Sequence, residues 1–269
     1  MTAAALPGTL TLGLAQGGVE LRKFFRQREA VAFTFALPAL LLALLGSIFG
    51  HSFADTGVTA AQVFAASMVG SGIVSTSFVS MGTAIVFDRE DGTLKRLRGT
   101  PIPAGAYFLG KIVLVVVSSL AEVALLLVVG TLLLGLHLPT SPEKWLTFAW
   151  VFVLATTSCA LLGIAASSAA RSPNGATAVM NLLYVGFQFI SGVFVTPITA
   201  LPATMVYVAS FFPLKWICQG FRSVFLPDSM AAYEMAGTWE LGKVSLVLGA
   251  WVVAGLVLSR STFRWTDNR

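Results

Sequence analysis

Long stretches without charge constrain this chain more than any other feature of its sequence. Residues 56–87 contain no charged side chain, and residues 112–136 contain one, Glu122. Only 11% of the 269 residues are charged and 56% are hydrophobic, whereas soluble domains carry roughly 25% charged residues. We therefore expect an all-α integral membrane protein, because a helix satisfies its own backbone hydrogen bonds in lipid.

Six apolar runs are expected to cross the bilayer as helices. They cover residues 30–50, 58–87, 112–136, 145–168, 177–195 and 244–258. The second run is longer than the roughly 30 Å hydrocarbon core requires, so we expect it to tilt or to project from the membrane. These spans form a single transmembrane domain, 30–269, which follows a leader and interfacial helix in residues 1–29.

The stretch 88–111 is dense in charge and separates the second span from the third. It holds three acids, Asp88, Glu90 and Asp91, and five bases, Arg89, Lys95, Arg96, Arg98 and Lys111. Acids before bases suit the dipole of a short helix, and the prolines that follow Thr100 and Ile102 stop that helix within the segment 88–103. An ordinary basic cytoplasmic loop is the alternative interpretation.

The distribution of basic residues predicts the orientation of the chain. Of its 17 Lys and Arg residues, 13 lie on one side if the six spans alternate, and four lie on the other: Lys144, Lys215, Arg222 and Lys243. Basic residues favour the cytoplasmic side. We therefore expect both termini in the cytoplasm and a multi-pass protein of the inner (plasma) membrane.

The first 29 residues are expected to lie at the membrane surface. Leu21, Phe24 and Phe25 share one helical face with bases around it, which is typical of an interfacial helix over 20–29. An ordinary basic flank of the first span is equally compatible with this pattern. Before it, Pro7 and glycines such as Gly13 and Gly17 are expected to interrupt a spanning helix, and no cleavable signal peptide is evident.

The region 196–242 is divided by prolines at 197, 202, 213 and 227 into pieces too short to cross a membrane. Residues 203–212 are nevertheless apolar enough to enter one. Broken backbone at membrane depth is tolerated where protein or water surrounds it. We therefore expect a re-entrant pair of half-helices on the outer side, between the fifth and sixth spans.

The sequence offers little material for catalysis. It contains no G-x-x-x-x-G-K-[ST] phosphate loop and no histidine pair, and Cys159 and Cys218 have no metal-site spacing. The bases lie at membrane edges, which is no nucleic-acid signature. We expect neither an enzyme nor a metal or cofactor bound by this chain. Glu122 is an acid inside a span, which suggests either a polar contact for a cationic substrate or a structural acid.

The second span carries a small, mildly polar face. Ser67, Ser71 and Ser75 recur at steps of four, so they share one side of the helix. Such a face indicates close helix packing. The alternative is the wall of a translocation path, and the candidate residues for that wall are Met68, Ser71, Ser75, Phe78, Met81 and Glu122.

Two stretches resemble the permease subunits of type-2 ATP-binding-cassette (ABC) exporters. The first runs Glu90-x-Gly92-Thr93-Leu94-Lys95-x-Leu97-x-x-Thr100-Pro101-Ile102 and closes with Gly110-Lys111. The second comprises Ser191-Gly192-Val193-Phe194, Pro197, Leu201-Pro202, Phe212-Pro213-Leu214 and Phe221-Arg222. The basic aromatic segment 21–29 is similar to the interfacial elbow helix of that family.

This resemblance implies a half-transporter. It would pair with a second permease, identical or paralogous, and with two ATPase subunits that bind ATP and Mg. The family's coupling helix, which docks on the ATPase, would fall on Asp88, Arg89, Glu90, Asp91, Gly92, Thr93, Leu94, Lys95, Arg96 and Leu97. Its outer hairpin would include Pro202, Pro213 and Arg222. The expected substrate is a hydrophobic small molecule or lipid, with a glycan or polymer as the alternative.

Two other functional classes remain open from the residues alone. An ion-coupled secondary carrier needs ionisable residues in its spans and shows repeated halves, but only Glu122 is available and no internal repeat is evident. A membrane scaffold that transports nothing is the other class. An ATPase that co-purifies with the chain would separate the first interpretation from both.

Overall fold

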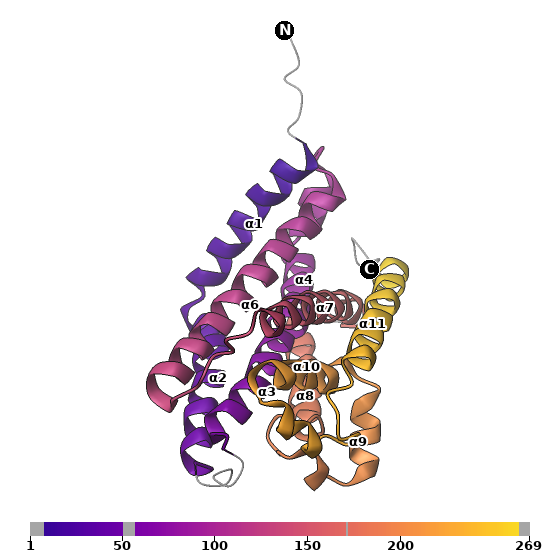
Figure 1. Cartoon of the computed structure of the whole chain (residues 1–269). Coiled ribbons are helices and arrows are strands. Elements are labelled where there is room, and N and C mark those ends of the chain that lie inside the picture. The colour runs from indigo at the N-terminus through magenta and orange to yellow at the C-terminus, as the bar shows by residue number, and fades with distance from the viewer. Residues whose placement is uncertain (1–7, 51–56, 171, 264–269) are drawn as a thin grey trace.

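The computed structural model describes residues 8–50, 57–170 and 172–263. Within these residues helices are the only regular elements, as expected (Figure 1). The long ones are α1 (Thr9–Arg26), α2 (Arg28–Ile48), α3 (Ala60–Val74), α4 (Met81–Glu90), α6 (Ala104–Leu134), α7 (Pro142–Ser167), α8 (Pro173–Ile190), α10 (Pro213–Phe225) and α11 (Leu241–Thr262). The short ones are the π-helical η2 (Ser75–Ser80), α5 (Thr93–Arg98), η3 (Ile198–Ala200), α9 (Ala203–Ser210) and η4 (Asp228–Tyr233).

Four helical runs among the described residues are long and apolar enough to cross a membrane. They are α3–η2–α4 taken together, α6, α7 and α11. They coincide within a few residues with the second, third, fourth and sixth expected spans, although α6 begins at Ala104 rather than at 112. A shorter apolar helix covers Thr34–Ile48. The integral membrane class is supported, whereas the count of six spans stays a prediction.

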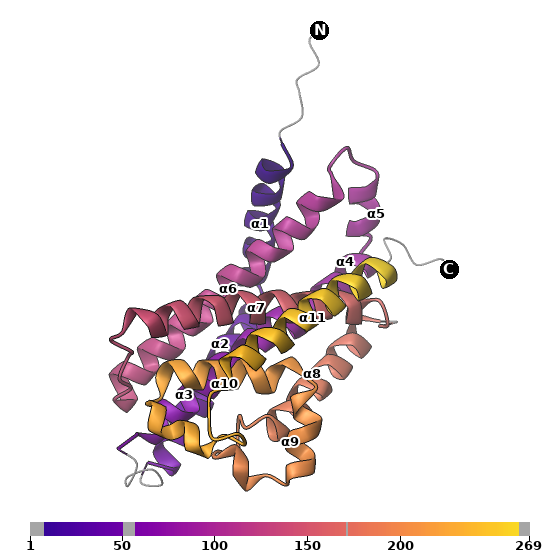
Figure 2. The ribbon, with the colours of Figure 1, turned by 45° about the vertical axis from the view of Figure 1, so that its right-hand side comes forward.

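Contacts between helix ends divide the bundle into two ends. At one end, the Phe108 ring of α6 lies 5.0 Å from the Phe263 ring after α11, and Arg89 of α4 donates to the carbonyl of Ser167 at the end of α7 (3.1 Å). Figure 2 shows α5 at this same end. At the other end, Lys144 at the start of α7 donates to the carbonyl of Leu226 after α10 (2.6 Å). The start and the end of α7 thus lie at opposite ends of the bundle, as a helix that crosses a membrane requires.

Within the proline-divided region, α10 is the element buried inside the bundle, whereas α9 is largely exposed. Every residue of α10 is buried, and its apolar face packs against α3 and α7. Pro213 occupies the first turn of α10, where a missing N–H costs nothing. The preceding helix α9 follows Pro202 and is joined to α10 by the Trp216 indole, which donates to the Ser210 carbonyl (2.7 Å). Two short helices thus lie where half-helices are expected; their depth in a membrane stays a prediction.

The N-terminal helix is longer than the sequence suggests. α1 begins at Thr9 and lies along the first part of α6, as Figure 1 shows. Its glycines are packing positions: a Cβ at Gly13 would overlap Leu109, and one at Gly17 would lie 2.7 Å from Val113. These glycines therefore do not interrupt α1, although α1 is not among the described helices that are long and apolar enough to cross a membrane. Residues 1–7 lie outside the described part of the chain.

The charged segment is not one helix that begins at Asp88. α4 continues to Glu90, the chain turns at Gly92 with a left-handed φ of 75°, and α5 starts at Thr93. A positive φ costs a glycine little, which explains why the chain turns there. The dipole argument therefore applies only to Asp91 and α5, because Asp88 and Glu90 lie at the carboxyl end of α4.

The α7–η2 contact is a tight point in the packing. A Cβ at Gly163 of α7 would lie 2.7 Å from the Phe78 carbonyl oxygen and 3.2 Å from that of Ser77. Both neighbours are backbone atoms, so they cannot move aside as a flexible side chain would. Gly163 thus allows α7 to approach the second span closely.

We expect Gly163→Ala to destabilise the protein by about 1–3 kcal/mol, the usual cost of overpacking. Gly249→Ala is the matched control, since nothing lies within 4 Å of that Cβ and alanine favours a helix by roughly 0.5–1 kcal/mol. Thermal unfolding in detergent, followed by tryptophan fluorescence, measures both. Equal midpoints for the two variants would contradict this account of the α7–η2 contact.

Candidate functional site

The predicted coupling residues divide into an exposed and a buried group. Their exposure is as follows: Glu90, Asp91, Lys95 and Arg96 are exposed, Gly92, Thr93 and Leu97 are half-buried, and Asp88, Arg89 and Leu94 are buried. The segment therefore presents charge to the surroundings on α5 and its turn. Its first residues belong to the interior of the bundle instead.

The turn before α5 is held by hydrogen bonds within the segment. The Asp91 carboxylate accepts from the Thr93 N–H (2.8 Å), and the Arg96 guanidinium donates to the Thr93 hydroxyl (3.0 Å) and to the Asp91 carbonyl (3.3 Å). Partial burial would raise the pKa of Asp91, but its hydrogen bonds to Thr93, with help from Lys23 and Arg96, lower it overall. Asp91 thus favours its charged form in this turn.

A buried ionic cluster fixes the end of the second span. Lys111 of α6 lies between two carboxylates, 2.7 Å from Glu20 Oε2 of α1 and 2.6 Å from Asp88 Oδ2 of α4. The Tyr107 hydroxyl donates to Asp88 (3.0 Å), and Lys23 lies 3.6 Å from the other Asp88 oxygen. We call Glu20, Lys23, Asp88, Tyr107 and Lys111 the ionic cluster.

The ionic cluster balances its own charges. It contains two carboxylates and two ammonium groups, and only the Lys23 side chain, at 46% exposure, reaches solvent to any extent. Buried charges are tolerated when they are paired and hydrogen-bonded. The cluster therefore ties α1, α4 and α6 together immediately before α5. Arg89 adds a link to α7 through the Ser167 carbonyl.

Sequence reasoning missed most of this cluster. Lys111 was assigned to the cytoplasmic loop, but it lies inside α6 with 1% of its side chain exposed. Its partner Glu20 precedes it by 91 residues, and nothing in the pattern of either segment predicts that pairing. A charged residue about two turns inside an otherwise apolar helix is the signal that was available.

The small polar face of the second span packs against α8 and the turn after it. The Ser67 hydroxyl donates to the Gly192 carbonyl (3.3 Å), and the hydroxyls of Ser71 and Tyr184 lie 2.8 Å apart. The hydroxyl of Thr76, the residue after Ser75, lies 2.5 Å from the Ser119 hydroxyl of α6. These contacts match the helix-packing interpretation of the face.

The candidates for a translocation path lie at different places in the fold. Met68 and Ser71 are buried in the main core, Ser75 and Phe78 are half-buried in η2, and Met81 lines a pocket on another side of the span. Glu122 is 1% exposed, and both of its carboxylate oxygens lack a hydrogen-bond partner among the described residues. Its carboxylate lies against Gly72 of α3, where any Cβ would collide with it.

The region 196–242, in which the sequence predicts an outer hairpin, contains a second buried ion pair. Arg222 of α10 is 3% exposed, and its Nε lies 2.5 Å from Glu234 Oε1, just after η4. Its Nη1 lies 3.5 Å from both the Ser67 hydroxyl and the Gly192 carbonyl. Arg222 thus anchors the hairpin from inside the bundle rather than at its surface. Glu234 is a further residue that sequence reasoning missed.

The described residues show how the charged segment is connected to the rest of the bundle. They contain no group of three or more His, Cys, Asp or Glu side chains that could hold a metal ion. A charged protrusion at one end is instead joined through buried charges to a long apolar helix.

The sequence model of the ABC-2 type transporter family matches residues 18–226, from within α1 to the end of α10. The chain belongs to the ABC-2 type transporters. Among curated proteins no match to it is found. The match confirms the resemblance seen in the charged segment and the outer hairpin, and it makes the chain a permease component of an ABC transporter. Permeases of this family generally work with ABC ATPase subunits.

Removal of the Lys111 ammonium group from the ionic cluster should destabilise the fold, because it leaves the carboxylates of Glu20 and Asp88 buried without their cation. We expect Lys111→Met to destabilise this ABC-2 permease by about 3–5 kcal/mol. Lys23→Met is the control, because a half-exposed ion pair contributes at most about 1 kcal/mol. The midpoint of thermal unfolding in detergent distinguishes the two, and similar midpoints would refute the assigned role of Lys111.

Proposed function

We propose that the chain is the membrane-spanning subunit of an ATP-driven exporter. It forms the transport pathway with a second permease, a copy or a paralogue, and two separate ATPase subunits supply the energy. ATP and Mg bind to those partners and not to this chain. The segment from Asp88 to Leu97 is the coupling element that docks on an ATPase.

The single observation that carries this proposal is the connection between the exposed charges and the second span. The charged surface of α5 follows directly on a helix end that Asp88 and Arg89 fix to α1, α6 and α7. A force applied to α5 is therefore transmitted to several helices at once instead of being absorbed by a loose loop. An ordinary basic loop needs no such anchoring.

The orientation follows from the same segment. The excess of bases around α5 favours the cytoplasmic side, and an ATPase that uses cellular ATP works on that side. We place both termini in the cytoplasm, the protein in the inner (plasma) membrane, and the α9–α10 hairpin toward the outside.

The substrate class is the part of the proposal that rests most on family likeness. Apolar spans with aromatic and methionine side chains suit a hydrophobic small molecule or a lipid that leaves outward. A glycan or polymer is the alternative within the family. Hydrolysis of ATP by the purified complex in lipid, screened for stimulation by candidate compounds, identifies the class. A complex that hydrolyses ATP without any response to compounds that it exports would overturn the proposed coupling.

The coupling role predicts a loss of ATPase association without a loss of folding. Glu90 and Lys95 are exposed, and the double reversal Glu90→Lys with Lys95→Glu keeps the net charge. We expect it to weaken association by about 1–2 kcal/mol, roughly tenfold, as for a pair of exposed charges. Co-purification of the ATPase and thermal unfolding of the permease are the two measurements.

The matched control for this experiment is Glu143→Lys, at an exposed position in the first turn of α7 at the opposite end of the bundle. It should leave ATPase association unchanged. If the double reversal assembles as well as this control does, the coupling assignment is wrong.

An ion-coupled carrier is the second candidate, and the unpartnered carboxyl of Glu122 is the observation that favours it. Such a carrier would stop when the proton gradient collapses while ATP stays high. In the exporter proposed here Glu122 instead makes a polar contact with cationic substrates, which favour its ionised form when they bind.

We therefore expect Glu122→Gln to reduce export of cationic hydrophobic compounds several-fold while export of neutral ones continues, because the amide keeps the shape and removes the charge. Glu143→Gln, at an exposed acid, is the control. Export assays on vesicles over a range of pH values make the comparison. Normal export of both compound types at every pH would make Glu122 a structural acid.

A further inference from the structure

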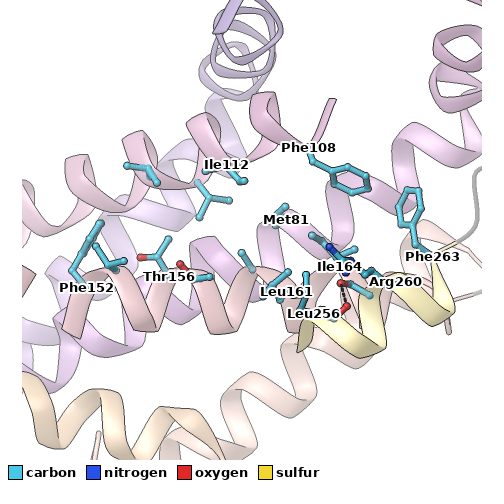
Figure 3. A pocket seen from close by; sticks show the side chains of 16 residues that line it. Met81, Phe108, Ile112, Phe152, Thr156, Leu161, Ile164, Leu256, Arg260 and Phe263 are labelled. Carbon is cyan, nitrogen blue, oxygen red and sulfur yellow. Dashed lines mark hydrogen bonds between the residues drawn. The ribbon is translucent and has the colours of Figure 1, made fainter. Parts of the chain in front are cut away.

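A pocket of about 550 Å³ lies between α4, α6, α7 and α11, at the end of the bundle that carries α5 (Figure 3). This volume is within the roughly 300–1,000 Å³ of ligand-binding pockets. The lining includes Met81, Phe108, Ile112, Leu161 and Phe263 and is almost wholly apolar. No residue of α3, α8 or α10 lines it, so it is separate from the small polar face and the outer hairpin.

Arg260 is the charged residue of this lining. It stands in the last turn of α11, and Figure 3 shows its side chain directed toward Ile164 at the pocket wall. It makes no ion pair with any residue that the structure describes, and no acidic side chain is part of the lining. The pocket therefore combines an apolar body with one positive charge at the end of a membrane helix.

The pocket walls are exposed where they face outward. Ile112 of α6 is 49% exposed, Val153 of α7 is 59% exposed, and Leu256 of α11 is 40% exposed. In a membrane helix, apolar side chains of this kind meet lipid. These exposed walls let the pocket open sideways toward acyl chains, and Arg260 stands in the last turn of a helix long and apolar enough to cross the membrane, where head groups are expected.

We propose that this pocket holds an anionic phospholipid of the cytoplasmic leaflet, with one acyl chain between α6, α7 and α11 and its phosphate on Arg260. The leaflet follows from the orientation given under the proposed function. The charge, the apolar lining and the sideways opening each match one part of such a lipid: the phosphate, the chain and the route from the bilayer. A zwitterionic lipid lacks the net negative charge that an unpaired arginine attracts.

Thr156 gives the proposal an independent test. Its side chain lines the pocket and is 6% exposed, and its hydroxyl has no hydrogen-bond partner among the described residues. An acyl chain gains nothing from a hydroxyl and is disfavoured by an unsatisfied one. A polar occupant, in contrast, would use it. The effect of Thr156→Val therefore distinguishes the two kinds of occupant by its sign.

The binding experiment uses the full-length chain, purified in detergent with an equal mixture of phosphatidylglycerol and phosphatidylcholine. Native mass spectrometry counts the lipids retained on each chain. The wild type should retain more phosphatidylglycerol than phosphatidylcholine. Arg260→Gln should reduce that preference roughly fivefold, the effect of about 1 kcal/mol for one basic residue at an anionic surface. Lys243→Gln, at the other end of α11, is the control and should change nothing.

Two further variants test the apolar part of the site. Thr157 is exposed and lines the pocket, so Thr157→Trp should fill the pocket and abolish retention. Leu246→Trp, at an exposed position of α11 outside the lining, should not. Thr156→Val should preserve or increase retention.

Four outcomes would overturn the proposal: equal retention of both lipids by the wild type, unchanged preference in Arg260→Gln, lower retention in Thr156→Val, or a changed oligomeric state in Thr157→Trp with its lipid retained. The last would make the pocket an interface between copies. Lipid retention is measured without an ATPase or a transported compound. Failure of this proposal is therefore distinguishable from failure of the proposed export function.

Discussion

The contact of Lys111 with two buried carboxylates determines how the rest of the molecule is held together at its charged end. Glu20, Asp88 and Lys111 come from three different helices, and each would be costly to bury without the others. Their mutual satisfaction sets the position of α1 beside α6 and of the end of α4 beside both. The turn at Gly92 and the exposed charges of α5 take their place in space from this arrangement.

The ionic cluster and the Arg222–Glu234 pair differ in how completely their buried charges are satisfied. In the ionic cluster, Lys111 bonds to two carboxylates and Asp88 also accepts from Tyr107. Around Arg222 and Glu234, one guanidinium nitrogen and one carboxylate oxygen have no partner among the described residues. A change of state that separates Arg222 from Glu234 therefore breaks fewer interactions than one that displaces Lys111. The ionic cluster is therefore the more completely satisfied of the two, although Arg89 beside it keeps two guanidinium nitrogens without a partner among the described residues.

Hydropathy and charge predicted the helical membrane class, because long runs without charge leave few alternatives. The motif from Glu90 to Lys111 and the proline-bearing segment up to Arg222 predicted the family, which the match over residues 18–226 confirms. The helix ends at Pro213 and Gly92 follow from the backbone properties of these two residue types.

The sequence did not reveal features that depend on which helices meet. Gly13 and Gly17 suggested a broken helix because their partners Leu109 and Val113 are distant in the chain. For the same reason Lys111 looked like a loop residue, and neither Glu20 nor Glu234 stood out. Pairing across long sequence separations is decided by packing, which a single sequence records only indirectly.

The π-helical segment η2 sets the rotational phase of the second span. Residues 75–80 follow a wider winding than the α-helices on either side, and a π-helical turn accommodates one surplus residue. Each residue of an α-helix advances the side-chain direction by about 100°. A regular helix lacking that surplus residue would therefore turn Asp88 about 100° away from the side on which Lys111 lies. The irregular winding in mid-span is thus what brings the two ends of this helix into register with different neighbours.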